Sequence, residues 1–417
     1  MLSEPRTAVA DHPEAVELPR RFRRNPYALS ALLLAPHLSA ETTAALRQAI
    51  GLDRIDWGEI LTLVNLHFCT PLLYVRLRQH RLLSHLPPEL REFLHCLHEA
   101  NCERNDAFRN ALRCILQVAD GLGISCLLLK GAASLADDLY RDPGARMLGD
   151  LDLLVEPPGT ERLWRELVGQ WGYVTATEAP AGDFPVSPDY RRHHLPRLFL
   201  PGTPVVIEIH HRPSRGQAGR GLPASLFWAG KVPIDFVGQS TFIPDPTSRL
   251  LHATFHALLP MREFIQSSLP LAALAEFSAL GVRYSSEIQH HRWLAVGTET
   301  GADHEFQVFR QLARQLMGGG EGDADWRSRL AIARIVAGGN APALSDTRFR
   351  QGEKVKSVLI RAFYLSHLPG WLWRNPCYGR GWTALPRRFY YLRQWWGARN
   401  RAARLMKFAK NDFVPEE

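Results

Sequence analysis

The chain has 417 residues, of which 46% are hydrophobic, so it is long enough for two or three structural units with buried cores. Its formal net charge is +8, and most of the basic excess lies near the end of the sequence. There is no run of about 18 apolar residues, which argues against a membrane-spanning helix, and the N-terminus lacks the apolar centre of a signal peptide. The six cysteines form no CxxC pair. We therefore expect free thiols and a cytoplasmic protein.

The first hundred residues divide into two predicted parts. Residues 1–25 mix acidic and basic side chains and end in a basic patch, so we expect a disordered tail there. Residues 26–104 carry short apolar groups at helical spacing, separated by Pro or Gly. This pattern predicts an N-terminal helical region.

Residues 105–246 combine helical and strand patterns. Apolar positions recur at helical spacing from Phe108 to Ala119 and are followed by glycines that favour a helix end. The further expected elements are a strand over residues 124–129, a strand from Asp150 to Val155, a helix capped by Thr160, and a hairpin with strands at 195–200 and 205–210. This order of elements predicts an α+β core.

The remaining sequence is predicted to contain two further segments. Residues 247–345 return to a helical pattern, interrupted by the glycine-rich stretch Gly318–Asp323. We interpret that stretch as a connection, because a phosphate-binding loop would follow a strand and precede Lys-Ser or Lys-Thr. Residues 346–417 form a basic, aromatic-rich C-terminal segment. Packing with solvated charges is the favoured interpretation, a peripheral membrane or protein contact comes next, and nucleic acid is least favoured because no known module is present.

Three acidic residues form the main candidate site. Asp150 and Asp152 lie two apart at the start of a strand, so they point to the same face, and two like charges on one face favour a cation between them. Glu208 lies among apolar neighbours in the second hairpin strand and would become a third carboxylate if that strand lies beside the first. Three converging carboxylates could hold two Mg²⁺ ions. The alternatives are a solvated strand end or a helix-capping arrangement for the aspartates and an arginine partner for Glu208.

Several histidines were weighed as additional ligands. His210 and His211 end the hairpin strand, where a structural, hydrogen-bonded role is favoured over catalysis. His252 and His256 have a spacing that permits zinc binding, but packing is favoured because no accompanying Glu is present. The cluster at residues 191–194, which contains Arg191, Arg192, His193 and His194, is expected to be a solvated loop, with triphosphate or acceptor binding as the minority hypothesis.

Four sequence blocks together resemble the bacterial uncharacterised nucleotidyltransferase family of the polymerase-beta-like superfamily. The blocks are Lys130-Gly131, Tyr140–Arg146, Gly149–Val155 and Glu208-Ile209-His210, within a resemblance that covers roughly residues 105–260. The resemblance implies a small mixed sheet with flanking helices, embedded between the helical regions. It also implies that Asp150, Asp152 and Glu208 are catalytic and metal-binding, and that Lys130, Gly131 and Arg146 approach the nucleotide phosphates.

These residues lead to a functional hypothesis. We expect a nucleotidyltransferase that transfers a nucleoside monophosphate from a nucleoside triphosphate, such as ATP, to a hydroxyl or similar group of an unidentified acceptor. The acceptor could be a small molecule, a peptide or a protein, and the expected cofactor is Mg²⁺, or Mn²⁺ in its place. The alternatives are a noncatalytic nucleotide-binding or scaffold protein and a phosphotransferase that uses the same metal site.

Overall fold

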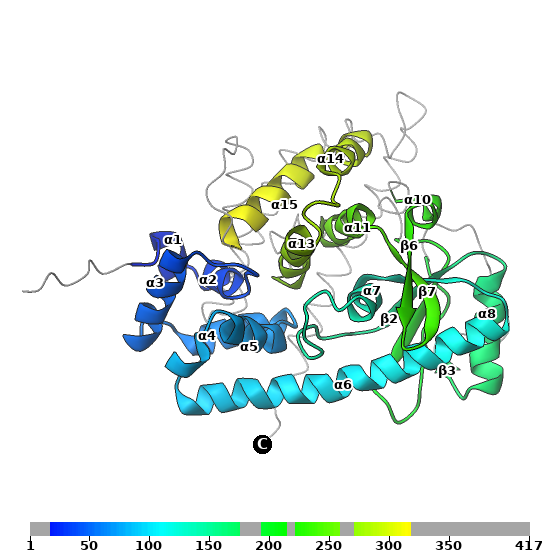
Figure 1. Ribbon diagram of the computed structural model, residues 1–417, viewed down its shortest axis with the longest axis horizontal. Coiled ribbons are helices and arrows are strands. Elements are labelled where there is room, and N and C mark those ends of the chain that lie inside the picture. Colours follow the sequence, from blue (N-terminus) through cyan, green and yellow to red (C-terminus); the bar gives the residue numbers. More distant parts are fainter. Residues whose placement is uncertain (1–16, 176–192, 215–221, 259–270, 318–417) are drawn as a thin grey trace, which may run out of the picture.

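The computed structural model describes residues 17–175, 193–214, 222–258 and 271–317 (Figure 1). The helices are α1 (Arg20–Arg23), α2 (Pro26–Leu33), α3 (Ala40–Gly51), α4 (Trp57–Leu66), α5 (Thr70–Gln79), α6 (Pro88–Gly121), α7 (Lys130–Ala136), α8 (Gly159–Gln170), α10 (Ala224–Ala229), α11 (Pro246–Leu258), α13 (Leu271–Arg283), α14 (His290–Glu299) and α15 (Asp303–Leu316), with a short 3₁₀ turn at Leu83–His85. The strands are β1 (Cys126–Leu129), β2 (Leu151–Val155), β3 (Val174–Thr175), β4 (Leu198–Phe199), β5 (Val206–His210), β6 (Lys231–Phe236) and β7 (Gln239–Pro244).

The strands form one mixed sheet in the order β3-β4-β5-β2-β1-β7-β6. At its centre β2 is antiparallel to β1 and parallel to β5, and β1 is parallel to β7. The predicted mixed sheet with flanking helices is confirmed, including the hairpin of β4 and β5. The hairpin of β6 and β7 was not predicted. It turns at Val237 and Gly238, which both have positive φ, and Val237 is a residue type rarely found in that conformation.

The two faces of the sheet pack against different sets of helices. Leu128 and Leu153 contribute to a core shared with α6, α7 and α8, whereas Leu127, Leu129 and Leu154 contribute to a core shared with the N-terminal helices and with α11, α13, α14 and α15. This division follows from the alternation of side chains along a strand. Asp152 has the same parity as Leu154, so it faces the second core. The candidate site therefore lies on the face that the N-terminal and later helices cover.

The N-terminal helices begin where the sequence supplies caps. The side chains of Asn25, Ser39 and Asp56 accept hydrogen bonds from the first turns of α2, α3 and α4. The prediction of a disordered tail up to residue 25 is wrong from residue 17 onward, because α1 forms there and Leu18 and Phe22 are buried. Residues 1–16 lie outside the described residues.

One long helix, α6, connects the N-terminal helices to the sheet (Figure 1). Its 34 residues correspond to about 51 Å of helix. The predicted boundary between residues 104 and 105 falls inside α6. Some described helices precede the sheet in the sequence and others follow it. Both groups share one hydrophobic core, which includes Leu32 of α2 and Phe309 of α15. The helical segments are thus joined by packing, although they are far apart in the chain.

Several other predictions can be compared with the fold. The helix predicted to be capped by Thr160 instead begins at Gly159, and the Thr160 hydroxyl donates a hydrogen bond to the carbonyl of Val155. Five cysteines are free thiols, and Cys377 lies outside the described ranges. The glycine-rich stretch at 318–323 and the C-terminal segment at 346–417 also lie outside them. Within the described ranges, no helix combines the length and apolar character needed to cross a membrane.

Candidate functional site

Asp152 and Glu208 are neighbours across two central strands. Asp152 on β2 is paired in register with Glu208 on β5, so the two carboxylates lie side by side on one face of the sheet. Both are buried, with exposed fractions of 1% and 3%. Two buried carboxylates in adjacent positions are unfavourable unless cations or hydrogen-bond donors neutralise them. The surrounding side chains supply such groups.

Lys130 provides the cation for Asp152. It follows β1 directly, and its Nζ lies 2.6 Å from Oδ1 of Asp152. Its φ is 46°, in the left-handed region that residues other than glycine seldom adopt. This conformation occurs where the chain turns from β1 into α7. Backbone strain at such a position is typical of functional sites.

His210 links the two acids. Its Nε2 lies 2.8 Å from Oδ1 of Asp152 and 3.2 Å from Oε2 of Glu208, and its ring is fully buried. Residues 208 and 210 share a face of β5, so the register that pairs Asp152 with Glu208 also brings His210 to Asp152. We refer to Asp152, Glu208 and His210 as the β2–β5 cluster.

Arg197 provides the cation for Glu208. Its Nε donates a hydrogen bond of 2.5 Å to Oε1 of Glu208, and its own side chain is 54% exposed. Nε2 of His194 lies 3.7 Å from the same carboxylate oxygen. The expected alternative, an arginine partner for Glu208, is therefore present in the structure. Because Arg197 is half exposed, it can leave Glu208 at a lower cost than a buried partner could.

The electrostatics of the cluster reflect this pairing. Burial alone would raise the pKa of Asp152, but Lys130 and the hydrogen bond with His210 outweigh burial and hold the pKa well below its usual range. Burial would likewise raise the pKa of Glu208, and the bond with His210 contributes most to lowering it. For His210, burial acts to lower the pKa, but its two carboxylate partners raise it. The cluster thus favours ionised acids and a protonated imidazole.

Asp150 has a different environment. It precedes β2, is half-buried, and has a pKa raised to about 6, first by burial and then by the negative charge of Asp152. The charges of Lys130 and Glu208 also act on it, so it lies near the cluster. Among the described residues, one ligand atom each from Asp152, Glu208 and His210 lies within 4.8 Å of the others, and Asp150 is not part of this group. Asp150 is the more accessible acid of the pair.

The residues predicted to contact phosphate lie close to one another. Gly131 is buried in the first turn of α7, and a Cβ at this position would lie 2.5 Å from Cδ2 of Leu148 and 3.2 Å from Nε of Arg146. Arg146 forms an ion pair of 2.8 Å with Glu276 of α13. Glycine at this position therefore allows close packing between α7 and the segment before β2.

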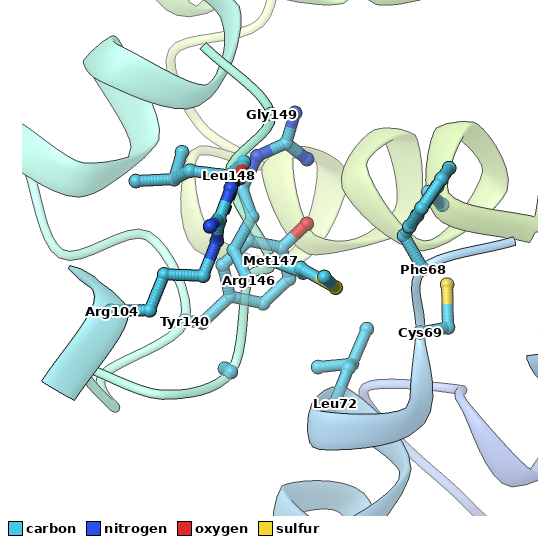
Figure 2. Close-up of a pocket in the computed structure, with 11 residues that line it drawn as sticks. Phe68, Cys69, Leu72, Arg104, Tyr140, Arg146, Met147, Leu148 and Gly149 are labelled. Carbon is cyan, nitrogen blue, oxygen red and sulfur yellow. Dashed lines mark hydrogen bonds between the residues drawn. The ribbon is translucent and has the colours of Figure 1, made fainter. Parts of the chain in front are cut away.

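A cavity of about 260 Å³ lies beside Arg146 (Figure 2). It is lined by Phe68, Cys69 and Leu72 from the N-terminal helices and by residues 145–149 from the segment before β2. Two of its residues, Phe68 and Met147, have large exposed apolar side chains. Because Gly149 borders the cavity, a molecule bound there would lie next to Asp150. The N-terminal helices thus supply one wall of a space that adjoins the candidate site.

The histidine predictions have separate outcomes. His193 and His194 are half-buried, and their rings lie 5.0 and 5.3 Å from that of His210, so they are not in a solvated loop. Arg191 and Arg192 lie outside the described residues. The ring of His252 packs edge-on against Phe227 with centroids 5.4 Å apart. The rings of His252 and His256 also pack edge-on against each other, with centroids 6.5 Å apart.

The donor set of the β2–β5 cluster fits a divalent metal ion. One ligand atom each from Asp152, Glu208 and His210 lies within 4.8 Å of the others, and Asp150 adds a further carboxylate nearby. Carboxylate oxygens suit Mg²⁺ and Mn²⁺, and a neutral imidazole suits Mn²⁺ better than Mg²⁺. His210 would have to lose its proton to become a ligand. A metal ion at this position would compete with Lys130 and Arg197 for the same oxygens.

Sequence reasoning missed Arg197 as a site residue. The pairing of Leu198 with Ile207 in the hairpin places Arg197 opposite Glu208. The predicted turn at residues 201–204 implied this register, so the signal was present in the sequence. Glu276, the partner of Arg146, gave no comparable signal because it lies on a helix more than a hundred residues away.

The mixed sheet, with paired acids at its centre and a lysine at the start of α7, has the features expected of a nucleotidyltransferase core. The family described as "Uncharacterised nucleotidyltransferase" matches residues 53–318, more than half of the chain, and the chain belongs to this family. The match extends beyond the motif blocks into the N-terminal and later helices. Membership supports nucleotidyl transfer as the general class of reaction.

Comparison with other proteins adds little to this assignment. No curated protein matches the chain. A solved structure of an antigenic nucleotidyltransferase-like protein from Paracoccidioides brasiliensis is 15% identical, with 53% of this chain and 97% of that chain covered and a TM-score of 0.31. A similarity this low supports no inference about substrate or mechanism.

Proposed function

We propose that the chain is a nucleotidyltransferase that depends on a divalent metal ion. It would transfer a nucleoside monophosphate from a nucleoside triphosphate to a hydroxyl or similar group of an acceptor and release pyrophosphate. The observation that supports this proposal most strongly is the pairing of Asp152 with Glu208 across adjacent strands, with Asp150 nearby. This arrangement concentrates acidic groups on one buried face, where they serve no evident packing purpose.

Asp150, Asp152 and Glu208 would hold Mg²⁺ or Mn²⁺. When bound, the ion would orient the triphosphate and stabilise the charge that develops on the departing pyrophosphate. The acceptor oxygen would attack the α-phosphorus, and the bond between that phosphorus and the pyrophosphate oxygen would break. The acceptor proton would pass to a carboxylate, and Asp150 is the most accessible of the three.

Lys130 and Arg146 would neutralise phosphate oxygens. The ammonium group of Lys130 now neutralises Asp152. If that carboxylate held a metal ion, the ammonium group of Lys130 would be available to a phosphate group. Arg146 would keep its ion pair with Glu276 through NH1, which fixes the direction of its guanidinium group. Both basic residues would thus be positioned before the substrate arrives.

The cavity beside Arg146 is a suitable place for part of the acceptor. Its lining is mainly apolar, and it adjoins Asp150 through Gly149. Filling it by Leu72→Trp should raise the KM for the acceptor more than the KM for the nucleotide. An equal change in both constants would argue against this placement.

The test of the proposed function is transfer of label from nucleotides. The full chain is incubated with Mg²⁺ or Mn²⁺, candidate acceptors, and each nucleoside triphosphate labelled on either the α- or the γ-phosphate. Label from the α-phosphate on the acceptor supports the proposal, and label from the γ-phosphate supports the alternative phosphotransferase. Nucleotide binding without turnover supports a noncatalytic role.

Glu208→Gln is the most informative variant for this test. It removes a charge whose arginine partner is half exposed, so the fold should tolerate it better than a change at Asp152. The expected loss of transfer is about 100-fold or more. Glu299→Gln, at an exposed position on α14, is the matched control and should keep full activity. Equal activity in the two variants would refute the role of Glu208.

A further inference from the structure

A second and larger cavity lies apart from the β2–β5 cluster. Its volume is about 530 Å³, and it is enclosed by residues 36–38, α5, the loop at 139–141 that follows α7, and the end of α13. In Figure 1, α5 and α13 lie on either side of that loop. The cavity is lined by five basic or imidazole side chains, namely His37, Arg76, His80, Arg141 and Arg283. We refer to it as the arginine cavity.

The charges of the arginine cavity are unbalanced. Its other lining residues are apolar or uncharged, and no Asp or Glu is among them. None of the ion pairs between described residues involves Arg76, Arg141 or Arg283. Elsewhere in this protein buried arginines have acidic partners, as Arg249 has in Asp137. The lining of this cavity therefore carries an excess of positive charge.

Arg76 gives the strongest indication that the cavity binds an anion. It is only 5% exposed, its NH1 donates a hydrogen bond of 2.7 Å to Oε1 of Gln79, and its Nε has no hydrogen-bond partner among the described residues. The ring of Tyr140 lies 5.9 Å away and offers a weak cation–π contact. A buried guanidinium without a carboxylate is costly. Burial accordingly lowers the pKa of Arg76.

The other two arginines are placed to share a ligand with Arg76. Arg283 donates hydrogen bonds to the backbone carbonyls of Asp137 and Asp138, the former at 2.6 Å, so its guanidinium is held in place without losing its charge. Arg141 is exposed at the rim, and its φ of 53° sets the direction of the loop there. The guanidinium groups of Arg283, which is fixed, Arg76, which is buried, and Arg141, which is exposed, thus border the same cavity.

We propose that the arginine cavity binds a small molecule that carries a phosphate group. A phosphate monoester carries between one and two negative charges near neutral pH and presents three oxygens, which matches several guanidinium groups better than a single carboxylate does. The apolar part of the lining would contact the remainder of the molecule. The volume lies in the range of small-molecule sites. This inference is independent of the proposed transfer reaction, because no residue of the β2–β5 cluster lines the cavity.

The proposal is tested by isothermal titration calorimetry of the full chain with pyrophosphate and with inorganic phosphate. A chelator in the buffer removes metal ions, and succinate serves as a carboxylate probe of similar size. Pyrophosphate should bind, and succinate should bind at least about tenfold more weakly. Absence of binding by both phosphate probes, or equal binding of succinate, would overturn the proposal.

Variants then locate the bound anion. Arg141→Gln changes an exposed residue and should weaken pyrophosphate binding at least about tenfold, which corresponds to about 1.4 kcal/mol. Arg162→Gln, at an exposed position on α8, is the matched control and should leave binding unchanged. If Arg141→Gln binds pyrophosphate as tightly as the wild type does, the anion occupies another site and the proposal is wrong.

Arg76→Gln provides a second variant at the buried position. If it folds, pyrophosphate binding should be lost, and the unliganded protein should not be much less stable, because an unpaired buried charge has been removed. If Arg76→Gln does not fold, pyrophosphate binding by Arg141→Gln decides whether the proposal stands.

Discussion

Asp150→Asn should make the metal-free protein more stable while it abolishes nucleotidyl transfer. In the folded chain the pKa of Asp150 rises from 3.8 to about 6, first because of burial and then because of the neighbouring charge of Asp152. A rise of about two pKa units corresponds to an upper limit of about 3 kcal/mol. Since the side chain is partly exposed to solvent, we expect about 1 to 2 kcal/mol. Asparagine avoids this cost because it carries no charge.

The sign of the effect depends on pH in a defined way. The folded state holds the Asp150 proton more tightly than the unfolded state, so the wild-type protein loses stability as the pH rises from about 4 to about 6. Above about pH 6 the wild-type protein has lost the whole of this contribution to its free energy of unfolding. Below about pH 4, both states have a neutral Asp150 and the advantage of the variant disappears.

The measurement is urea unfolding of both proteins in a chelating buffer, near pH 7.5 and near pH 4. Asp106→Asn, at an exposed position on α6, is the control and should change stability by less than about 0.5 kcal/mol. The reasoning fails if Asp150→Asn is no more stable than the wild type at the higher pH. It also fails if the advantage is the same at both values.

Three further predictions test the packing and charges around the site. Asp152→Asn should destabilise the protein by about 3 kcal/mol, because it leaves the half-buried Lys130 without its partner; chemical denaturation measures this. Gly131→Ala should lower the free energy of unfolding by about 1 to 3 kcal/mol, because the added Cβ would overlap the side chain of Leu148. Gly169→Ala on α8 should be neutral or stabilising, because an added Cβ there would meet no atom of another part of the chain within 4 Å. Arg197→Gln should bind Mn²⁺ more tightly by about tenfold, because it removes a cation that competes for the carboxylate on β5; calorimetry measures the affinity.

Each of these predictions has an outcome that contradicts it. An Asp152→Asn protein as stable as the wild type would show that Lys130 does not depend on the acid for neutralisation. Equal effects of alanine at the two glycines would show that packing at the start of α7 is loose. Unchanged or weaker Mn²⁺ binding by Arg197→Gln would indicate that the metal, if bound, does not use Glu208.

The comparison of Asp150 with Asp152 also limits how the site should be tested. The two acids look equivalent in the sequence, so the sequence alone would suggest replacing both. The structure separates them, because Asp152 is buried against Lys130 and His210 and Asp150 is half exposed. Loss of activity in the double variant could then reflect unfolding. Asp150→Asn and Glu208→Gln are the better tests.

Local sequence patterns predicted the central part of the fold. The apolar run before Lys130 and the alternation after Asp150 were sufficient to predict β1 and β2. The turn at residues 201–204 likewise predicted the β4 and β5 hairpin. These predictions succeeded because strand patterns depend on residues that are close in the chain. The β6 and β7 hairpin was missed because its turn uses Val237, which carries no turn signal.

The sequence by itself determined which residues could carry the chemistry: two aspartates at the start of a strand, a glutamate in an apolar strand, and a lysine before a glycine. The tertiary structure decided how they are paired, because strand order and helix packing bring together residues that are far apart in the chain. Only this packing places Glu208 beside Asp152 and assigns Arg146 to Glu276. It also gathers Arg76, Arg141 and Arg283 from three separate segments around one cavity.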